Sequence, residues 1–256
     1  MDNPKDYASI ARQVRRQVLT MIHKAGTSHI ASNFSATDLA VVLYENLKVD
    51  DSVVWSKGWC AALIYTMLAR HGVIPESDLA KFPNYPYIGL AEPSVPGVHV
   101  AGGSMGHGLP VAVGMALGNK RAGHAGLVYC IMSDGEMNEG TTWESAALAA
   151  HHKLDNLVVF IDVNKWQAMG KTEDVVDFED INQKWGAFNW TPYRINGHAH
   201  GEIESAILQG EHKKGPMVII CDTIKGKGVS FFEDHLLYHY KHVDVDEYKR
   251  AMEELA

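Results

Sequence analysis

Cysteine is scarce in this sequence, which has three cysteines in 256 residues, Cys60, Cys130 and Cys221. Their number is odd and their positions are far apart, so they form neither a disulfide framework nor the close spacing of a zinc site. These absences exclude the small disulfide-stabilised secreted proteins and favour a protein of the reducing cytoplasm.

Long apolar runs and an excess of basic residues are missing as well. No apolar run approaches the ~20 residues that a membrane-spanning helix needs. The polar N-terminus, residues 1–6, does not resemble a secretory signal. The net charge is −8, from 23 Lys and Arg against 31 Asp and Glu. This charge argues against nucleic acid or an anionic membrane as the main partner.

The stretch at 127–170 indicates how the core is built. The apolar runs at 127–132 and 157–163 are typical of buried strands, and the segment 141–152 has a helical pattern. The expected fold is α/β, a three-layer, doubly wound, mostly parallel sheet with helices on both faces. Because no repeat or interdomain linker interrupts the chain, we expect residues 1–256 to form a single domain.

A polar residue follows each of these two strands, Asp134 the first and Asn164 the second. In a parallel sheet the C-terminal strand ends meet at one edge, where ligands bind. Mg²⁺ prefers oxygen ligands and takes one or two carboxylates, with phosphate oxygens and water completing its shell. Gly135 would let the backbone approach a phosphate, and the N-terminus of the following helix would add N–H groups. The pattern favours a magnesium diphosphate site, although Asp-Gly alone is also a common turn.

At these residues the sequence resembles a known family. The tripeptide Ser-Asp-Gly at 133–135, followed about thirty residues later by Asn164, is similar to the thiamine diphosphate motif. The flanking residues Glu139-Gly140, Trp143-Glu144 and the segment 153–157 are similar to transketolases in particular. The likeness runs over nearly the whole chain but corresponds to the first third of a full-length transketolase. The sequence therefore resembles the N-terminal subunit of a split transketolase, with the thiamine diphosphate-binding fold.

The resemblance implies roles for individual residues. Mg²⁺, or Ca²⁺ or Mn²⁺ in its place, would be held by Asp134, Asn164 and the backbone carbonyl of Trp166. His29 and His239 would be the catalytic residues at the substrate. Thiamine diphosphate would contact Gly103, Met105, Asp134, Gly135, Glu139 and Asn164. Gly103 and Met105 would lie against its aminopyrimidine ring. Glu139, together with Glu144, would link the cofactors of paired sites.

Two departures from the family lie in its substrate channel. Transketolases have Ser-Lys-Gly-His where this chain has Ser-Lys-Gly-Trp, so Trp59 takes the place of a histidine. Transketolases also have Gly-His-Pro in the loop that corresponds to 88–93, where this chain has no histidine. We therefore expect a changed donor range, with a sugar phosphate or a modified sugar as substrate.

The resemblance also implies a partner. In the family, a glutamate on a pyrimidine-binding domain activates the cofactor, and this sequence contains no counterpart of that domain. We expect the transfer of a two-carbon ketol unit from a ketose donor to an aldose acceptor only together with a C-terminal transketolase subunit, which supplies the pyrimidine-binding and C-terminal domains. The expected assembly is a heterotetramer docked through the surface around 102–110 and 139–150.

Two other classes stay open at this point. One is another thiamine diphosphate enzyme subunit, similar to the E1 subunit of a 2-oxoacid dehydrogenase or to deoxyxylulose phosphate synthase. The other is a non-catalytic cofactor-binding subunit, against which the presence of both Asp134 and Asn164 argues.

Three further features have plain structural interpretations. Arg12, Arg15 and Arg16 on the helix expected at 5–24 are most simply a solvated face. The stretch Ser-Ala-Thr-Asp at 35–38 is expected to open the next helix as a cap, and a helix is expected at 177–185. The lysines Lys225 and Lys227 are compatible with a loop surface, although the family has Thr-x-Lys-Gly-Lys-Gly at this point.

Overall fold

The computed structural model describes residues 5–178, 180–211 and 213–256. Its centre is a five-stranded sheet in the order β1-β2-β3-β5-β4, in which every neighbouring pair is parallel. The strands are β1 (Ser52–Trp55), β2 (Val128–Ser133), β3 (Leu157–Val163), β4 (Thr191–Asn196) and β5 (Met217–Asp222). The expected parallel α/β sheet is confirmed.

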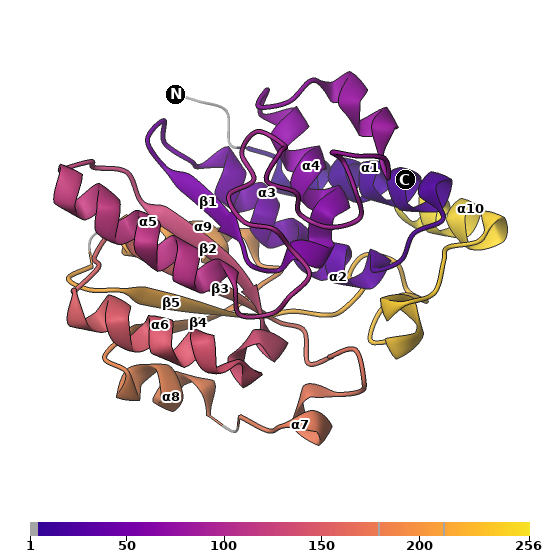
Figure 1. Cartoon of the computed structure of the whole chain (residues 1–256). Coiled ribbons are helices and arrows are strands. Elements are labelled where there is room, and N and C mark those ends of the chain that lie inside the picture. The colour runs from indigo at the N-terminus through magenta and orange to yellow at the C-terminus, as the bar shows by residue number, and fades with distance from the viewer. Residues whose placement is uncertain (1–4, 179, 212) are drawn as a thin grey trace.

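Helices cover both faces of this sheet (Figure 1). On one side lie α1 (Tyr7–Ala25), α2 (Ile30–Ser35), α3 (Thr37–Glu45), α4 (Ala61–Arg70) and α9 (His200–Glu211), with α10 (Val245–Glu254) packed against α1. On the other side lie α5 (Gly108–Ala122), α6 (Gly140–His151) and α8 (Ile181–Ala187). Shorter elements are η1 (Gly58–Cys60), η2 (Glu76–Lys81), η3 (Asp134–Asn138), α7 (Thr172–Val175) and η4 (Leu236–His239).

Strand β3 explains why the core has two halves. Successive side chains of a strand point to opposite faces of the sheet. Val158 and Phe160 accordingly belong to the hydrophobic cluster under α1, α3 and α4, whereas Val159 and Ile161 belong to the cluster under α5 and α6. By this alternation Asp162 points to the first face, so the sheet carries a buried carboxylate among the helices near its C-terminal edge.

The strand register places the polar residues of the sequence motif side by side. Ser133 of β2 pairs with Asp162 of β3, so Asp134 and Asn164 follow directly at the same edge of the sheet. Ser56 follows β1 and Thr223 follows β5 at this edge as well. Four parallel strands therefore deliver polar side chains to one place.

Two local predictions are right in part. A helix, α3, does open within 35–38, at Thr37, but no side chain caps it; Ser35 instead ends α2, and its hydroxyl donates a 2.6 Å hydrogen bond to Asp162. The helix expected at 177–185 is α8 and begins only at Ile181, because the side chain of Asp180 accepts the N–H of Gln183 and caps it there.

Across the described ranges, no helix is both long and apolar enough to cross a membrane.

Candidate functional site

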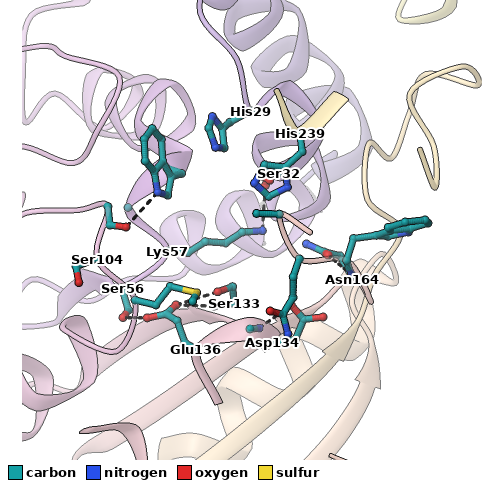
Figure 2. Close-up of a pocket in the computed structure, with 18 of the residues that line it drawn as sticks. His29, Ser32, Ser56, Lys57, Ser104, Ser133, Asp134, Glu136, Asn164 and His239 are labelled. Carbon is teal, nitrogen blue, oxygen red and sulfur yellow. Dashed lines mark hydrogen bonds between the residues drawn. The ribbon is translucent and has the colours of Figure 1, made fainter. Parts of the chain in front are cut away.

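A cavity of about 300 Å³ opens at the C-terminal edge of the sheet. Figure 2 shows the imidazoles of His29 and His239 on one side of it, Asp134, Glu136 and Asn164 on the other, and the Lys57 side chain reaching between them. Its further lining residues come mainly from three loops, those at 56–59, 103–105 and 166–169. The cavity thus gathers most of the residues that the sequence singled out.

Asp134 and Asn164 meet as the motif predicts. The Asp134 side chain is buried, and its carboxylate accepts hydrogen bonds from the backbone N–H groups of Gly135 and Lys165 and from the Thr172 hydroxyl. The Asn164 side-chain oxygen accepts the N–H of Trp166 at 3.0 Å, which folds the chain back just after the strand. The two side chains therefore form one oxygen-rich corner of the cavity.

The chemistry of this corner fits a divalent cation with a phosphate group. Burial, followed by the nearby Asp162 carboxylate, raises the pKa of Asp134 to about 6, so a cation would relieve an electrostatic cost there. The described residues contain no group of three or more His, Cys, Asp and Glu side chains suited to a metal. A cation at Asp134 would consequently need neutral oxygens, such as those of Asn164 and the Trp166 backbone, and oxygens of a second molecule.

The side chain of Gln167 also supports a phosphate group at this corner. Its amide nitrogen is buried and has no hydrogen-bond partner among the described residues, although Gln167 lines the cavity. Gly135 lies directly beside it, since a β-carbon on Gly135 would be 3.4 Å from the Gln167 side chain. A phosphate oxygen is an acceptor of the kind that this donor lacks.

The expected helix N-terminus beside Asp134 is not present in that form. Asp134 begins the 3-10 helix η3, and α6 begins only at Gly140. Ser133 and Glu136 form a capping box at the start of η3, in which the Glu136 carboxylate accepts the Ser133 N–H at 2.8 Å. A short capped turn therefore takes the place of the helix dipole at this point.

Glu136 also fixes the glycine-rich loop over the cavity. The Ser56 hydroxyl and the Gly106 N–H both donate to its buried carboxylate, and burial raises the pKa of this carboxyl. Gly102 and Gly58 pack backbone against backbone, since a β-carbon on Gly102 would lie 2.6 Å from the Gly58 Cα. This close approach, possible only for glycine, seats the loop that carries Gly103 and Met105.

An aromatic and imidazole cluster forms the opposite wall. The His29 ring stacks on Trp59 with 4.3 Å between centroids, and it meets His239 edge-on at 4.9 Å. The Trp59 indole N–H donates to the Gly103 carbonyl, so Trp59 connects this wall to the glycine-rich loop. His29 is held in the left-handed backbone region, with φ 69°, while its N–H donates to the His239 carbonyl. The two histidines are thereby fixed relative to each other.

Both imidazoles are neutral at physiological pH. Burial, followed by the charges of Lys225 and Lys57, lowers the pKa of His29 to about 4. Burial and the charge of Lys225 lower the pKa of His239 to about 3. The Lys225 ammonium lies 2.8 Å from Nδ1 of His239, and burial lowers its own pKa to about 8. Neutral imidazoles beside a lysine of low pKa can hold and pass protons to hydroxyl groups.

Sequence reasoning missed a buried ion pair behind the cavity. The Lys57 ammonium contacts the fully buried Asp162 carboxylate, which also accepts the hydroxyls of Ser35 and Thr223. Burial opposes both charges and is the largest single cause, but the ion pair and the neighbouring charges and hydrogen bonds together outweigh it, so the pKa of Lys57 is raised and that of Asp162 is lowered. A charged residue within the apolar strand 157–163 was the available signal, because a buried charge requires a partner.

The remaining predicted residues lie at the margin. Trp166 lines the cavity, and its indole N–H donates to Asp234. Glu139 is half-buried before α6 and Glu144 is exposed on it, and neither lines the cavity. The loop-surface interpretation is wrong for Lys225, which is fully buried.

Comparison with known proteins agrees with this geometry. The family model described as "Transketolase, thiamine diphosphate binding domain" matches residues 7–255. One subunit of the apulose-4-phosphate transketolase of Actinobacillus succinogenes is 32% identical, over 96% of this chain and 94% of that protein. The 6-deoxy-6-sulfo-D-fructose transketolase subunit SqwG of a Clostridium species is 36% identical over the same two shares.

A solved structure is similar over the entire fold. The transketolase of Campylobacter jejuni superposes with a TM-score of 0.91 at 28% identity, covering 99% of this chain. This chain spans 43% of that transketolase, whereas it spans nearly the full length of the two subunits.

Proposed function

The chain belongs to the transketolase family as its thiamine diphosphate-binding N-terminal part, and we propose that it acts as one half of a two-subunit ketol transferase. Together with a C-terminal subunit, it would transfer a two-carbon ketol unit from a ketose donor to an aldose acceptor. The observation that carries this proposal is the cavity in which a buried Asp134–Asn164 corner faces two neutral imidazoles, His29 and His239.

The oxygen-rich corner is the proposed cofactor site. Asp134, Asn164 and the Trp166 carbonyl would hold Mg²⁺, with Ca²⁺ or Mn²⁺ as substitutes, and the Gln167 amide would donate to a phosphate oxygen. Gly103 and Met105 would lie against the aminopyrimidine, beside Gly135 and, further out, Glu139. Thiamine diphosphate, when bound, supplies the nucleophilic carbon and the electron sink that carbon–carbon bond cleavage needs.

The opposite wall is the proposed place of proton transfer. His29 and His239 would hydrogen-bond the sugar hydroxyls, which they can do in either direction because both rings are neutral. Lys225, with a pKa of about 8 and its Nζ on His239, can return a proton to that ring. Trp59 stacks on His29 and shields one side of this wall from water.

A partner subunit is part of the proposal. The family match is to a thiamine diphosphate-binding domain, and the chain spans only 43% of a full transketolase. The resemblance to transketolases implies that the acid that activates the cofactor lies on the pyrimidine-binding domain, which this chain would need from a partner. Two relatives of equal length are named as subunits, which supports a separate polypeptide for the missing section. We propose two copies of each subunit related by twofold symmetry, since paired sites are the common solution for such assemblies.

The substrate would be a modified or phosphorylated sugar. One relative is named for apulose 4-phosphate and another for 6-deoxy-6-sulfo-D-fructose, so chains of this length serve uncommon sugars. Trp59 in place of a histidine, and no histidine at 88–93, support a similar specialisation here. The buried, free cysteines support a reducing cytoplasmic setting. We also propose that residues 1–256 form one domain.

The test is reconstitution. The purified chain is titrated with thiamine diphosphate and Mg²⁺ by calorimetry, by itself and with a C-terminal transketolase subunit, and ketol transfer is measured over a panel of donors and acceptors. Metal-dependent cofactor binding and transfer by the pair are expected. Cofactor binding without any ketol transfer, together with 2-oxoacid decarboxylation, would favour the E1-like alternative, and no binding at all would refute the proposal.

A further inference from the structure

A second buried ion cluster lies below the cavity, around Asp38 on α3. Its carboxylate forms a two-pronged pair with Arg15 of α1, with N–O distances of 2.6 and 3.2 Å. Nδ1 of His198 lies 2.8 Å from Oδ2, and Nε2 of His200 lies 3.0 Å from Oδ1. The predicted solvated arginine face is therefore wrong for Arg15, whose side chain is 6% exposed. Each carboxylate oxygen has one guanidinium and one imidazole partner.

The hydrogen bonds assign the state of His198. A carboxylate can only accept, so Nδ1 of His198 carries the proton that it donates to Asp38. The other nitrogen, Nε2, accepts the backbone N–H of Ile224 at 2.8 Å. The ring is thus a neutral bridge of fixed tautomer between a buried carboxylate and one backbone amide.

That amide belongs to the segment 223–228, which does not itself line the cavity but contacts His239, a residue that does. Ile224 stands between Thr223, whose hydroxyl donates to Asp162, and Lys225, whose ammonium contacts His239. A second contact reaches the end of the same segment, because a β-carbon on Gly228 would lie 3.0 Å from the Arg15 side chain. The cluster therefore supports the segment 223–228 from beneath at two points.

We propose that Asp38 and His198 are positioning residues of the cofactor and substrate site. The carboxylate fixes the imidazole, the imidazole holds the Ile224 N–H, and this bond sets the position of Lys225 against His239. The inference rests on the proposed function only for its effect on ligand binding, because the hydrogen-bond relay itself belongs to the free chain.

His200 provides a matched control within the same cluster. It contacts the same carboxylate through the other oxygen and also packs near Tyr7, with 5.8 Å between ring centroids. It begins α9 and has no hydrogen bond to the segment 223–228 among the described contacts. If the cluster served stability alone, loss of either histidine would have similar effects.

Two amide substitutions separate the two bonds of His198. Asparagine places an amide nitrogen near the position of Nδ1, and glutamine places an amide group near that of Nε2. His198→Asn should keep the hydrogen bond to Asp38 and lose the one from the Ile224 N–H, whereas His198→Gln should keep the hydrogen bond from the Ile224 N–H. Losing this bond should reduce both the protection of the Ile224 amide and the cofactor affinity about tenfold, as expected for one hydrogen bond to a buried group.

The experiment measures hydrogen exchange of the Ile224 amide in the full chain without cofactor. It then measures the affinity of the assembled complex for thiamine diphosphate with Mg²⁺. We expect His198→Asn and His198→Ala to raise the exchange rate and the Kd about tenfold, while His198→Gln and His200→Ala stay within about threefold of the wild type. Equal effects of His198→Asn and His200→Ala would overturn the proposal.

A further measurement needs no variant. The ¹⁵N shifts of the wild-type His198 ring should identify Nδ1 as protonated and Nε2 as bare, and a proton on Nε2 would also overturn the proposal. Failure of the wild-type complex to bind thiamine diphosphate would instead count against the proposed function, and the exchange and shift data would still decide the relay.

Discussion

The backbone N–H of Lys165 donates a 2.9 Å hydrogen bond to the carboxylate of Asp134. The bond joins the ends of the neighbouring strands β2 and β3, and Lys165 adopts a left-handed φ of 67° to make it. The carboxylate therefore organises the turn that follows Asn164 before any ligand is bound. If Asp134 holds the metal as we propose, cofactor binding and the local order of this turn would be coupled through one side chain.

The first prediction concerns this side chain. Asp134→Ala should lower the affinity for Mg²⁺ and thiamine diphosphate by at least about 100-fold, because it removes the anionic oxygen from the metal site. Calorimetric titration of the assembled complex measures the loss. Asp155→Ala is a suitable control, since that carboxylate is exposed and pairs with Lys120 far from the cavity. Unchanged affinity in Asp134→Ala would show that the metal binds elsewhere.

The second prediction is loss of stability in mild acid. His29 and His239 have folded pKa values of about 4 and 3, below the ~6.5 of an unfolded histidine. Between pH 4 and 6.5 the unfolded chain binds more protons, so the free energy of unfolding falls as the pH falls. Allowing for the partial exposure of His239, we expect a loss of about 2 kcal/mol from pH 7 to pH 5.

Urea unfolding followed by circular dichroism measures this loss at each pH. Asp134 acts in the opposite sense, because its raised pKa of about 6 lets the folded chain gain a proton first. A variant carrying both His29→Asn and His239→Asn isolates the histidine contribution. Its stability should change less between pH 7 and 5 than that of the wild type, and an equal change would contradict the assignment.

The placement of Asp134 and Asn164 at neighbouring strand ends could be predicted from the sequence because the signal is local. Asp134 and Asn164 each follow an apolar strand directly, so strand ends and one crossover suffice to bring them together. For Asp38, Asp162 and Lys225 the local sequence did not identify the partner, even where the charge within the strand at Asp162 showed that one was needed. Their partners are Arg15, Lys57 and His239, which come from other elements.

Burial was misjudged for the same reason. A lysine in a glycine-rich loop, such as Lys225, and an arginine on an amphipathic helix, such as Arg15, are ordinarily solvated. Here Gly228 packs against the Arg15 side chain, and Lys225 is buried with its ammonium on His239, so tertiary packing decides the burial of both residues.

The third prediction concerns the buried pair of Lys57 and Asp162. Lys57→Met should reduce the free energy of unfolding by about 3 kcal/mol, because it leaves a fully buried carboxylate without its cation. Adding Asp162→Asn should recover part of the loss, since the uncompensated charge is then removed as well. Lys48→Met, which breaks an exposed pair with Glu211, should change stability little. Equal losses in the free energy of unfolding for Lys57→Met and Lys48→Met would show that burial does not decide how much an ion pair contributes to stability here.

The fourth prediction concerns Trp59. Trp59→His restores the imidazole of ordinary transketolases and removes the indole bond to the Gly103 carbonyl. We expect kcat/KM of the complex for xylulose 5-phosphate with ribose 5-phosphate to rise at least about tenfold, which is below the ~100-fold that a well-positioned acid–base group typically contributes. Trp59→Phe keeps an aromatic ring on His29 without the imidazole, so it should give no gain. Fast turnover of this substrate pair by the wild type would contradict the proposed specialisation.

The last prediction concerns the surface that the partner covers. Leu148 on α6 is 47% exposed and lies within 139–150, and the neighbouring helix α5 carries the exposed Gly114 and Gly118. Leu208 on α9 is 54% exposed but lies on the opposite side of the sheet. The two leucines therefore match in type and exposure, while their helices α6 and α9 pack on opposite faces of the sheet, which Figure 1 shows as a cartoon.

Leu148→Asp should weaken binding of the C-terminal subunit by at least about tenfold, because a charge would be buried in an apolar contact, whereas Leu208→Asp should leave it unchanged. Analytical ultracentrifugation measures assembly, and thermal unfolding of the isolated chain checks that both variants fold. Ketol transfer should fall with assembly in Leu148→Asp and return when both proteins are concentrated, since mass action opposes a weaker interface. Robust transfer by the isolated wild-type chain would refute the need for a partner, because its cavity would then have to supply the activating acid itself.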